Sequence, residues 1–259
     1  MIKFLAKGLI RDRSRSLFPL LTIIITVTLV IFGIGFMEGA MNNFIQSTAV
    51  ISSGHVKVVT KAYEKESSQL PNDLALFETN KIIQNLSVLY PNYFWTPRIT
   101  FGGLLDTPNE DGDTKEQGPV FGIGIDFHSK TSRQIEIWEL EKYLLHGNLP
   151  KNTNDALIST KLAKQLSINV GSTVTLISTT MDNAFTTYNF EITGIFNLNK
   201  GQVDRQMMLV DISSARQALG MEGAASEILG YHQSLYYNDN EATSMRNDFN
   251  LTISDSITK

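Results

Sequence analysis

The chain has 259 residues, no cysteine, 42% apolar residues and a formal net charge of −4. Without cysteine there can be no disulfide, thiolate nucleophile or cysteine metal site. A mildly acidic chain with no basic stripe argues against a nucleic-acid partner. The length is sufficient for one folded domain of ordinary size or two small ones.

Residues 17–37, LFPLLTIIITVTLVIFGIGFM, form an uncharged apolar run. About 20 apolar residues in a helix span a hydrocarbon core of about 30 Å. The hydroxyls of Thr22, Thr26 and Thr28 can each bond to a carbonyl one turn earlier. Pro19 is expected in the first turn, where its missing N–H costs little. We therefore predict a transmembrane helix over 17–37.

A secretory signal peptide is the main alternative for this run. Its apolar core is usually about 7–15 residues and ends at a small-residue cleavage site. Here the run is longer and continues into FMEGAM without a small-x-small pair. This favours an uncleaved anchor. A buried core helix is disfavoured, because no other segment could surround it.

Charge predicts the orientation of the helix. Residues 1–16 carry five basic side chains against one acidic, whereas the rest of the chain carries 17 basic against 25 acidic. Basic residues beside an apolar span stay on the cytoplasmic side. Residues 1–16 are therefore assigned as a cytoplasmic segment, which is either an amphipathic helix in the headgroup layer or simply a basic flank. The topology-setting residues are Lys3, Lys7, Arg11, Arg13 and Arg15.

An apolar stripe continues beyond the predicted membrane span, in a stalk over residues 38–50. It consists of Met37, Met41, Phe44 and Ile45, which share one helical face. Below, these four residues are called the stalk stripe. We expect it to pack against the folded domain or against a second helix, which could belong to another chain or to a continuation of this one.

The remaining residues predict an α+β domain outside the membrane. Strand, helix and strand patterns flank a β-rich insert, so we expect a first subdomain over 51–145 and 224–259 and an inserted subdomain over 146–223. Asp211 is expected to cap a helix over 212–219. Other predicted helices cover 73–89, 133–145, 160–166 and 240–249. Predicted strands cover 55–59, 93–105, 119–126, 156–159, 173–178, 185–196, 206–210, 226–236 and 251–257, with a polar loop at 107–118.

The domain shows no recognisable catalytic, cofactor or metal signature. There is no GxxxxGK[ST], HExxH or GxSxG motif. The segment GIGID at 122–126 lacks the third glycine of a dinucleotide fingerprint and indicates a closely packed strand. Asp126 and His128 form the best acid–base pair, but a strand end and turn explain them better.

Several segments in this order resemble the permeases of the MacB/FtsX-like ABC transporter family, which includes the lipoprotein-releasing LolC/LolE subunits. In this chain the matching segments follow a basic N-terminus and one apolar span. The matching segments are SSGHVKVV at 52–59, GIGIDF at 122–127, GNLP at 147–150, NDALISTKLAKQLSINVGSTVTLI at 154–177, FEITGIF at 190–196, Asp204, and QMMLVDISSARQALG at 206–220.

This resemblance implies a non-catalytic permease subunit in a bacterial inner membrane, with its main domain in the periplasm. The expected partners are a separate cytoplasmic ATPase, a second permease copy or homologue, a periplasmic lipoprotein or adaptor, and the lipid bilayer. The stalk is expected to carry ATP-driven motion to the periplasmic domain. Family members have three more spanning helices, so the chain is either a fragment of such a permease or a single-span relative.

Two other classes of function compete with the permease. One is a single-span sensor or binding protein, and the other is a membrane-anchored hydrolase, which the missing site pattern disfavours. The residues do not distinguish lipoprotein release from efflux, a homodimer from a heterodimer, or one ATPase from another.

Overall fold

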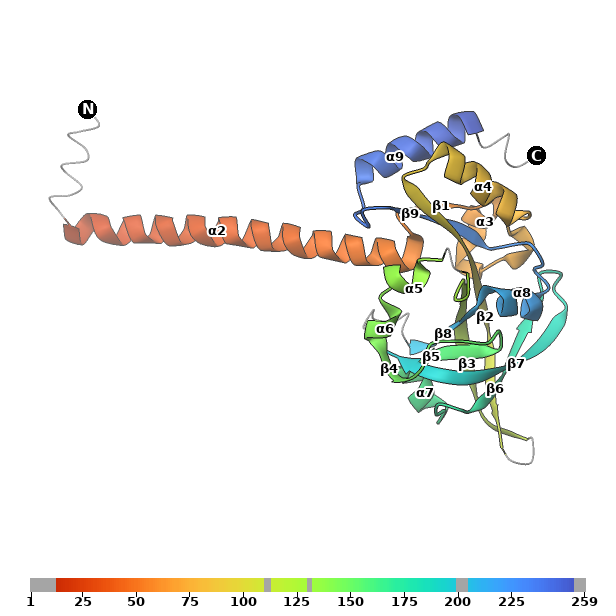
Figure 1. The fold of residues 1–259 in the computed structure, drawn as a ribbon. Helices are drawn as coiled ribbons and strands as arrows, with labels where there is room; N and C mark the ends of the chain where they lie inside the picture. The colour runs from red at the N-terminus through yellow and green to blue at the C-terminus, as the bar shows by residue number, and fades with distance from the viewer. Residues whose placement is uncertain (1–12, 110–112, 130–131, 199–204, 254–259) are drawn as a thin grey trace. The chain divides into compact units, whose positions relative to one another are not determined.

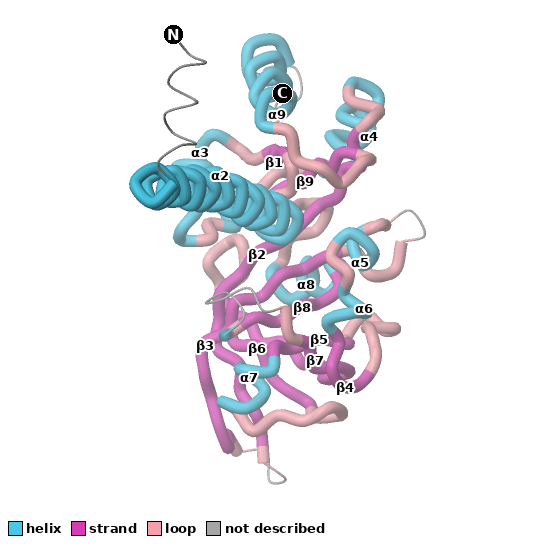
Figure 2. The backbone as a smooth tube through the Cα atoms, turned by 90° about the vertical axis from the view of Figure 1, so that its left-hand side faces the viewer, coloured by secondary structure: helices cyan, strands magenta, loops and turns pink. Residues whose placement is uncertain are grey.

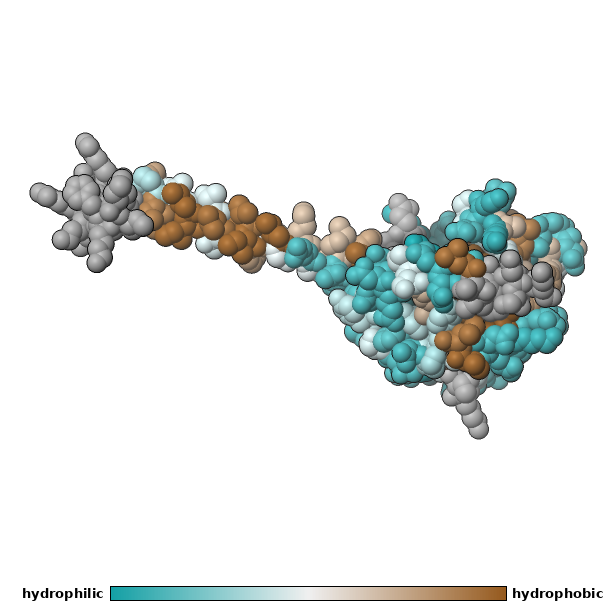
Figure 3. Space-filling model, turned by 90° about the horizontal axis from the view of Figure 1, so that it is seen from above, coloured by the Kyte–Doolittle hydropathy of each residue, from teal (hydrophilic) through white to brown (hydrophobic). Residues whose placement is uncertain are grey.

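The computed structural model describes residues 13–109, 113–129, 132–198 and 205–253, without the side chains of residues 13–16, 47–48, 252 and 253. Residues up to Thr48 form one unit, and residues from Ala49 onward form another. The first unit is the helix α2, Arg13–Thr48. It is the one described helix that is long and apolar enough to cross a membrane, and Figure 3 shows its apolar side chains in brown.

Two local expectations for α2 have different outcomes. Thr22 and Thr26 donate their hydroxyls to the carbonyls of Phe18 and Thr22, at 2.9 and 2.7 Å, as predicted. Pro19 does not lie in the first turn, because the helix already begins at Arg13. The basic flank is thus helical at its end, and the ring of Pro19 removes one backbone hydrogen bond inside the helix.

The second unit begins with a π-helical turn, η1 (Ala49–Ser53), and the short strand β1 (Val56–Val58). Gly54 separates them at a φ of +65°. The other elements run in the order α3 (Lys61–Glu66), η2 (Ser67–Gln69), η3 (Asn72–Leu74), α4 (Thr79–Leu89), β2 (Tyr93–Pro108), β3 (Thr114–Ile125), α5 (Gln134–Ile137), α6 (Leu140–Tyr143), β4 (Leu144–Gly147), β5 (Asp155–Ser159), α7 (Thr160–Gln165), β6 (Thr173–Thr179), β7 (Phe185–Phe196), β8 (Met207–Asp211), α8 (Ile212–Leu219), β9 (Glu227–His232), α9 (Asp239–Asp248) and η5 (Phe249–Ile253).

The described strands form one mixed sheet in the order β1-β9-β2-β3-β8-β5-β7-β4, and β6 pairs with β2 and β7. The pairs β3–β8 and β5–β7 are parallel. The 16-residue strand β2 pairs with β9 over its first six residues and with β3 and β6 further along. Figures 1 and 2 show β2 running from the β1–β9 part of the sheet into the part that contains β3 and β6. The α+β fold class is confirmed.

Three apolar clusters form the core. The largest lies around Ile99, Phe101 and Phe190. The second lies around Trp138 and Tyr231. The third is built on the β1–β9–β2 part of the sheet, where residues of α4 and α9 pack.

Close packing explains the glycines of GIGID. A Cβ at Gly122 would lie 2.0 Å from Cζ of Phe101, and one at Gly124 would lie 2.7 Å from Cβ of Ala215 on α8. Real Cβ atoms do not approach other atoms so closely. The prediction of a closely packed strand is therefore confirmed.

Three predicted elements need correction. The helix predicted over 73–89 begins only at Thr79, because Leu76 and Ala225 exchange backbone hydrogen bonds as an isolated bridge. The helix predicted over 133–145 is divided into α5 and α6 by Glu139, at a φ of +50°, and its end forms β4. The strand predicted over 251–257 is wrong where it is described, because residues up to Ile253 belong to the π-helical turn η5.

The polar loop predicted at 107–118 is shorter than expected, because β2 extends to Pro108 and β3 begins at Thr114. Strands of the predicted insert pair with β2 and β3, which belong to the predicted first subdomain. The division into 51–145 with 224–259 and 146–223 stays a prediction.

Candidate functional site

The residues singled out from the sequence lie on the N-terminal unit or before it. Lys3, Lys7 and Arg11 lie outside the described residues. Arg13 and Arg15 lie in the first turns of α2. Their role in setting the topology stays a prediction.

The stalk stripe lies entirely on α2. Met37, Met41 and Phe44 are each more than half exposed, and Ile45 is 38% exposed. Spacings of four, seven and eight residues place the four side chains on one helical face. What the stalk stripe packs against in the membrane-bound protein stays a prediction.

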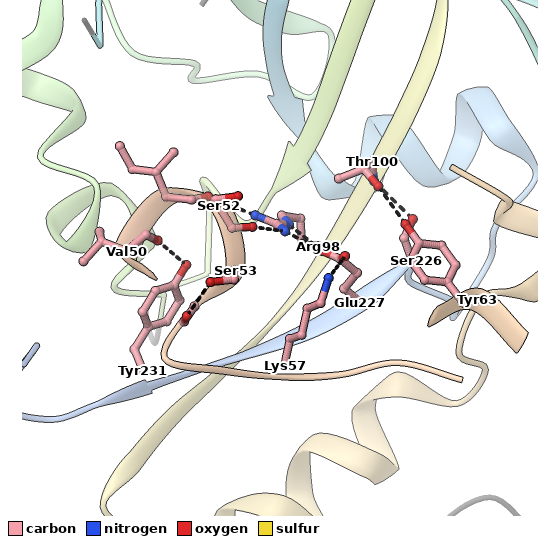
Figure 4. A network of polar contacts seen from close by, with 12 residues as sticks. Val50, Ser52, Ser53, Lys57, Tyr63, Arg98, Thr100, Ser226, Glu227 and Tyr231 are labelled. Atoms are coloured by element: carbon pink, nitrogen blue, oxygen red, sulfur yellow. Dashed lines mark hydrogen bonds and ion pairs between the residues drawn. The ribbon is translucent and has the colours of Figure 1, made fainter. Parts of the chain in front are cut away.

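A buried polar network, which the sequence reasoning did not identify, lies where the chain enters the second unit (Figure 4). Arg98 on β2 and Glu227 on β9 are directly opposed and are each 4% exposed. Arg98 donates from Nε to Oε2 of Glu227 at 3.0 Å, and its Nη2 donates to the same oxygen. Lys57 on β1 donates to Oε1 of Glu227 at 3.0 Å. One carboxylate therefore links three adjacent strands.

Arg98 also holds the end of η1. Its Nη1 donates to the carbonyl of Ile51 at 3.0 Å, and its Nη2 donates to the carbonyl of Ser52 at 2.6 Å. The last carbonyls of a helical turn lack intrahelical partners and carry partial negative charge, so a cation there is favourable. Arg98 thus caps this turn and neutralises Glu227 at the same time.

Tyr231 holds the preceding carbonyl of η1. Its hydroxyl donates to the carbonyl of Val50 at 3.0 Å and accepts the indole N–H of Trp138 at 3.2 Å. Tyr231 and Trp138 are almost fully buried. Two buried side chains therefore fix three consecutive carbonyls, those of residues 50, 51 and 52. Below, Arg98, Glu227, Lys57 and Tyr231 are called the anchor.

The electrostatics of the anchor favour the ionised pair. Burial raises the pKa of Glu227, but the charges of Arg98 and Lys57 and their hydrogen bonds outweigh it and leave the pKa below its ordinary value. Burial raises the pKa of Tyr231, so this hydroxyl remains a proton donor near neutral pH. A buried charge that is paired and hydrogen-bonded on several sides holds its neighbours in one geometry.

The anchor has no chemistry for bond cleavage. Its carboxylate is fully engaged by cations, and it contains no nucleophile beside a base. Asp126 accepts the backbone N–H groups of His128 and Ser129, at 3.2 and 2.8 Å, which is the geometry of a turn. Within the described ranges, no group of three or more His, Cys, Asp or Glu residues could hold a metal ion.

One sequence signal could have identified the anchor. Arg98 interrupts an apolar strand pattern, FWTPRITF, and Glu227 interrupts another, AASEILGY. A charge inside an apolar strand must be paired if it is buried. The partner could not be chosen from the sequence, because the pairing of β2 with β9 joins distant parts of the chain.

A family model described as MacB-like periplasmic core domain matches residues 16–237. Together with the apolar helix α2, this match defines the class of protein, a membrane-anchored periplasmic domain of the ABC transporter permease type. The chain belongs to the family of MacB-like periplasmic core domains.

Among solved structures, the chain is similar to the periplasmic region of MacB from Actinobacillus actinomycetemcomitans. The sequences are 13% identical, the match covers 78% of this chain and 83% of the other, and the TM-score is 0.48. A search of curated proteins found no significant match.

Proposed function

We propose that the chain is a permease subunit of a MacB- or Lol-type ABC transporter that passes motion from a cytoplasmic ATPase to its periplasmic domain. In this proposal α2 crosses the inner membrane with its N-terminus inside, as the basic residues predict. The ATPase is a separate chain that binds the cytoplasmic side. The permease itself is not catalytic, and it works beside a second copy or a homologue.

The observation that carries this proposal is the anchor. The helix α2 has 36 residues, a length of about 54 Å at 1.5 Å per residue, which exceeds the hydrocarbon core of about 30 Å. Its chain continues directly into η1, whose carbonyls are held by Arg98 and Tyr231. In this proposal, a displacement of the helix end reaches β2 and β9 through these hydrogen bonds.

Two steps test the proposal. First, the protein is purified from its native membrane in mild detergent, and the co-purifying ATPase is identified by mass spectrometry. We expect an ABC-type ATPase in a fixed ratio with the permease. A monomer without an ATPase would contradict the proposal and favour the single-span sensor.

Second, the anchor is loosened without removing the helix. We expect Arg98→Met to leave ATPase binding intact but to uncouple ATP hydrolysis from release or efflux. The matched control is Arg133→Met, because Arg133 pairs with Glu136 on the surface, with the two side chains 38% and 66% exposed. Equal transport by both variants would show that the anchor does not carry the motion.

A further inference from the structure

A buried histidine joins the start of strand β1 to the end of strand β9. His55 lies between η1 and β1, and its side chain is 5% exposed. Its backbone N–H donates to the carbonyl of Gly230 at 2.9 Å, and Nδ1 of its ring accepts the backbone N–H of His232 at 3.0 Å. The residue that precedes β1 is therefore bound to β9 both by its main chain and by its ring. Below, these two hydrogen bonds are called the His55 latch.

The hydrogen bond from His232 determines where the ring of His55 carries its proton. A ring nitrogen that accepts a hydrogen bond has no hydrogen of its own, so the neutral ring is protonated on Nε2. Nε2 is buried and has no hydrogen-bond partner among the described residues. A second proton would be placed on Nδ1, where it would point at the N–H of His232. Two donors cannot bond to each other, so the His55 latch requires a neutral ring.

The surroundings of the ring offer little that would stabilise a positive charge. The rings of Tyr231 on β9 and Tyr237 before α9 lie beside it, with centres 5.8 and 6.2 Å from that of His55. His232 would add a like charge whenever it is protonated itself. Lys57 on β1 is already bound within the anchor. A charged ring at this place would therefore lose its hydration without gaining a hydrogen-bond acceptor.

The acidic group that faces this site from α9 is Glu241. Its Oε1 accepts the hydroxyl of Tyr93 on β2 at 3.2 Å and lies 3.8 Å from Nε2 of His232. Burial, followed by the charge of His232, lowers the pKa of His55, and the attraction of Glu241 does not offset these effects. The ring of His55 is therefore neutral near pH 7, and the His55 latch is closed.

We propose that His55 is an acid-sensitive latch that releases β1 and the residue before it from β9 in mild acid. Protonation removes the acceptor for the N–H of His232, so the ring leaves its buried position and carries its charge in water. The opening ends at η1, because Arg98 and Tyr231 hold the carbonyls of residues 50–52 independently of His55. This device does not depend on the proposed transport function.

The proposal defines the pH range of the opening. The released ring is exposed and takes its ordinary pKa of 6.5. Because the pKa is lower in the closed state, the closed state is fully favoured above pH 6.5 and becomes less favoured as the pH falls below it. If only the open state binds the proton, its population increases about tenfold between pH 7.5 and pH 5.5. Glu227 does not contribute in this range, because its pKa lies below 4.5.

The test measures hydrogen exchange of the full chain in nanodiscs of zwitterionic lipid by mass spectrometry. Rates at pH 7.5 and pH 5.5 are each divided by the intrinsic exchange rate at that pH. We expect the protection of residues 55–58 and of the amide of His232 to be about tenfold lower at pH 5.5. The buried strands β5 and β8 are the internal reference and should keep their protection. The proposal is overturned if residues 55–58 keep theirs as well.

Two variants assign the effect to one histidine. His55→Asn retains a side-chain acceptor close to the position of Nδ1 but cannot be protonated, so its protection should be equal at the two pH values. His232→Gln removes the neighbouring titratable ring and keeps the backbone N–H that His55 accepts, so it should retain the tenfold difference. The matched control is His146→Asn, because His146 is exposed on β4. This control should behave like the unmodified chain.

The assignment can still be tested if His55→Asn does not fold. In that case His232→Gln decides, since a retained tenfold difference supports the His55 latch, whereas its loss assigns the proton to His232 and overturns the proposal. The proposal is also overturned if His55→Asn folds and still loses protection at pH 5.5.

Discussion

Arg98 and Glu227 are opposed across β2 and β9, and the same guanidinium that pairs with Glu227 also binds the carbonyls of Ile51 and Ser52. One side chain thus belongs both to the sheet and to the turn through which the chain enters it. The pair is buried, so its removal should affect stability as well as the transmission that we propose.

Removal of one partner of this pair should be strongly destabilising. We expect Arg98→Met to lower the free energy of unfolding by about 3–5 kcal/mol, because Glu227 then remains buried without its main partner. The double variant Arg98→Met, Glu227→Met should lose less unfolding free energy than Arg98→Met alone, because no buried charge is left. Denaturant unfolding of the detergent-solubilised chain measures both values, and additive losses would contradict the interpretation.

The stability of the second unit should decrease in acid. Because the pKa of Glu227 is lowered in the folded state from its ordinary value of 4.5, the unfolded chain binds more protons below about that pH. The stability contributed by the ion pair is therefore complete above pH 4.5 and is lost as the pH falls through the folded-state pKa. Melting temperatures measured from pH 7 to pH 3 should show this decrease, and Glu227→Gln should reduce its slope.

The packing of β3 predicts a difference between two glycines. We expect Gly122→Ala to destabilise the fold by about 1–3 kcal/mol, because the new methyl group would overlap the ring of Phe101. Gly102→Ala, on the neighbouring strand β2, should change stability by less than about 1 kcal/mol, because nothing lies within 4 Å of the new atom. Equal melting temperatures for the two variants would refute the close contact.

The natural absence of cysteine makes the stalk stripe directly testable. We expect Met41→Cys to form a disulfide-linked dimer in native membranes under mild oxidation, if the stripe packs on a second copy. Asn43→Cys should not do so, because position 43 points to the opposite face of α2. Non-reducing electrophoresis separates the outcomes. If the stalk stripe packs instead on a homologue whose own stripe lacks cysteine, neither variant should form a disulfide-linked homodimer.

Local patterns in the sequence were sufficient to predict the elements that depend only on neighbouring residues. The helix over 212–219 has its predicted limits, and Asp211 accepts the N–H of Ser213 as its cap. The strand predicted over 185–196 also has its predicted limits. These elements follow from residues that are neighbours in the chain, where periodicity and capping determine the conformation.

Pairing between distant residues determined the parts that could not be predicted. Residues 75–78 are not helical, because Leu76 is bound to Ala225. Likewise, Arg98 and Glu227 are each only an isolated charge in an apolar segment until β2 and β9 are placed side by side. The stalk stripe was visible in the sequence and the anchor was not, since a helical face is a local property and a cross-strand ion pair is not.

The length of β2 has a consequence for how the protein bears force. Because this strand is bonded to β9 near its start and to β3 and β6 further along, tension along its axis would load many interstrand bonds in shear at the same moment. Interstrand hydrogen bonds that are loaded together in shear resist a pulling force better than bonds that open one at a time. In the transmission of motion that we propose, this pairing favours displacement of the sheet as one body over opening from one end.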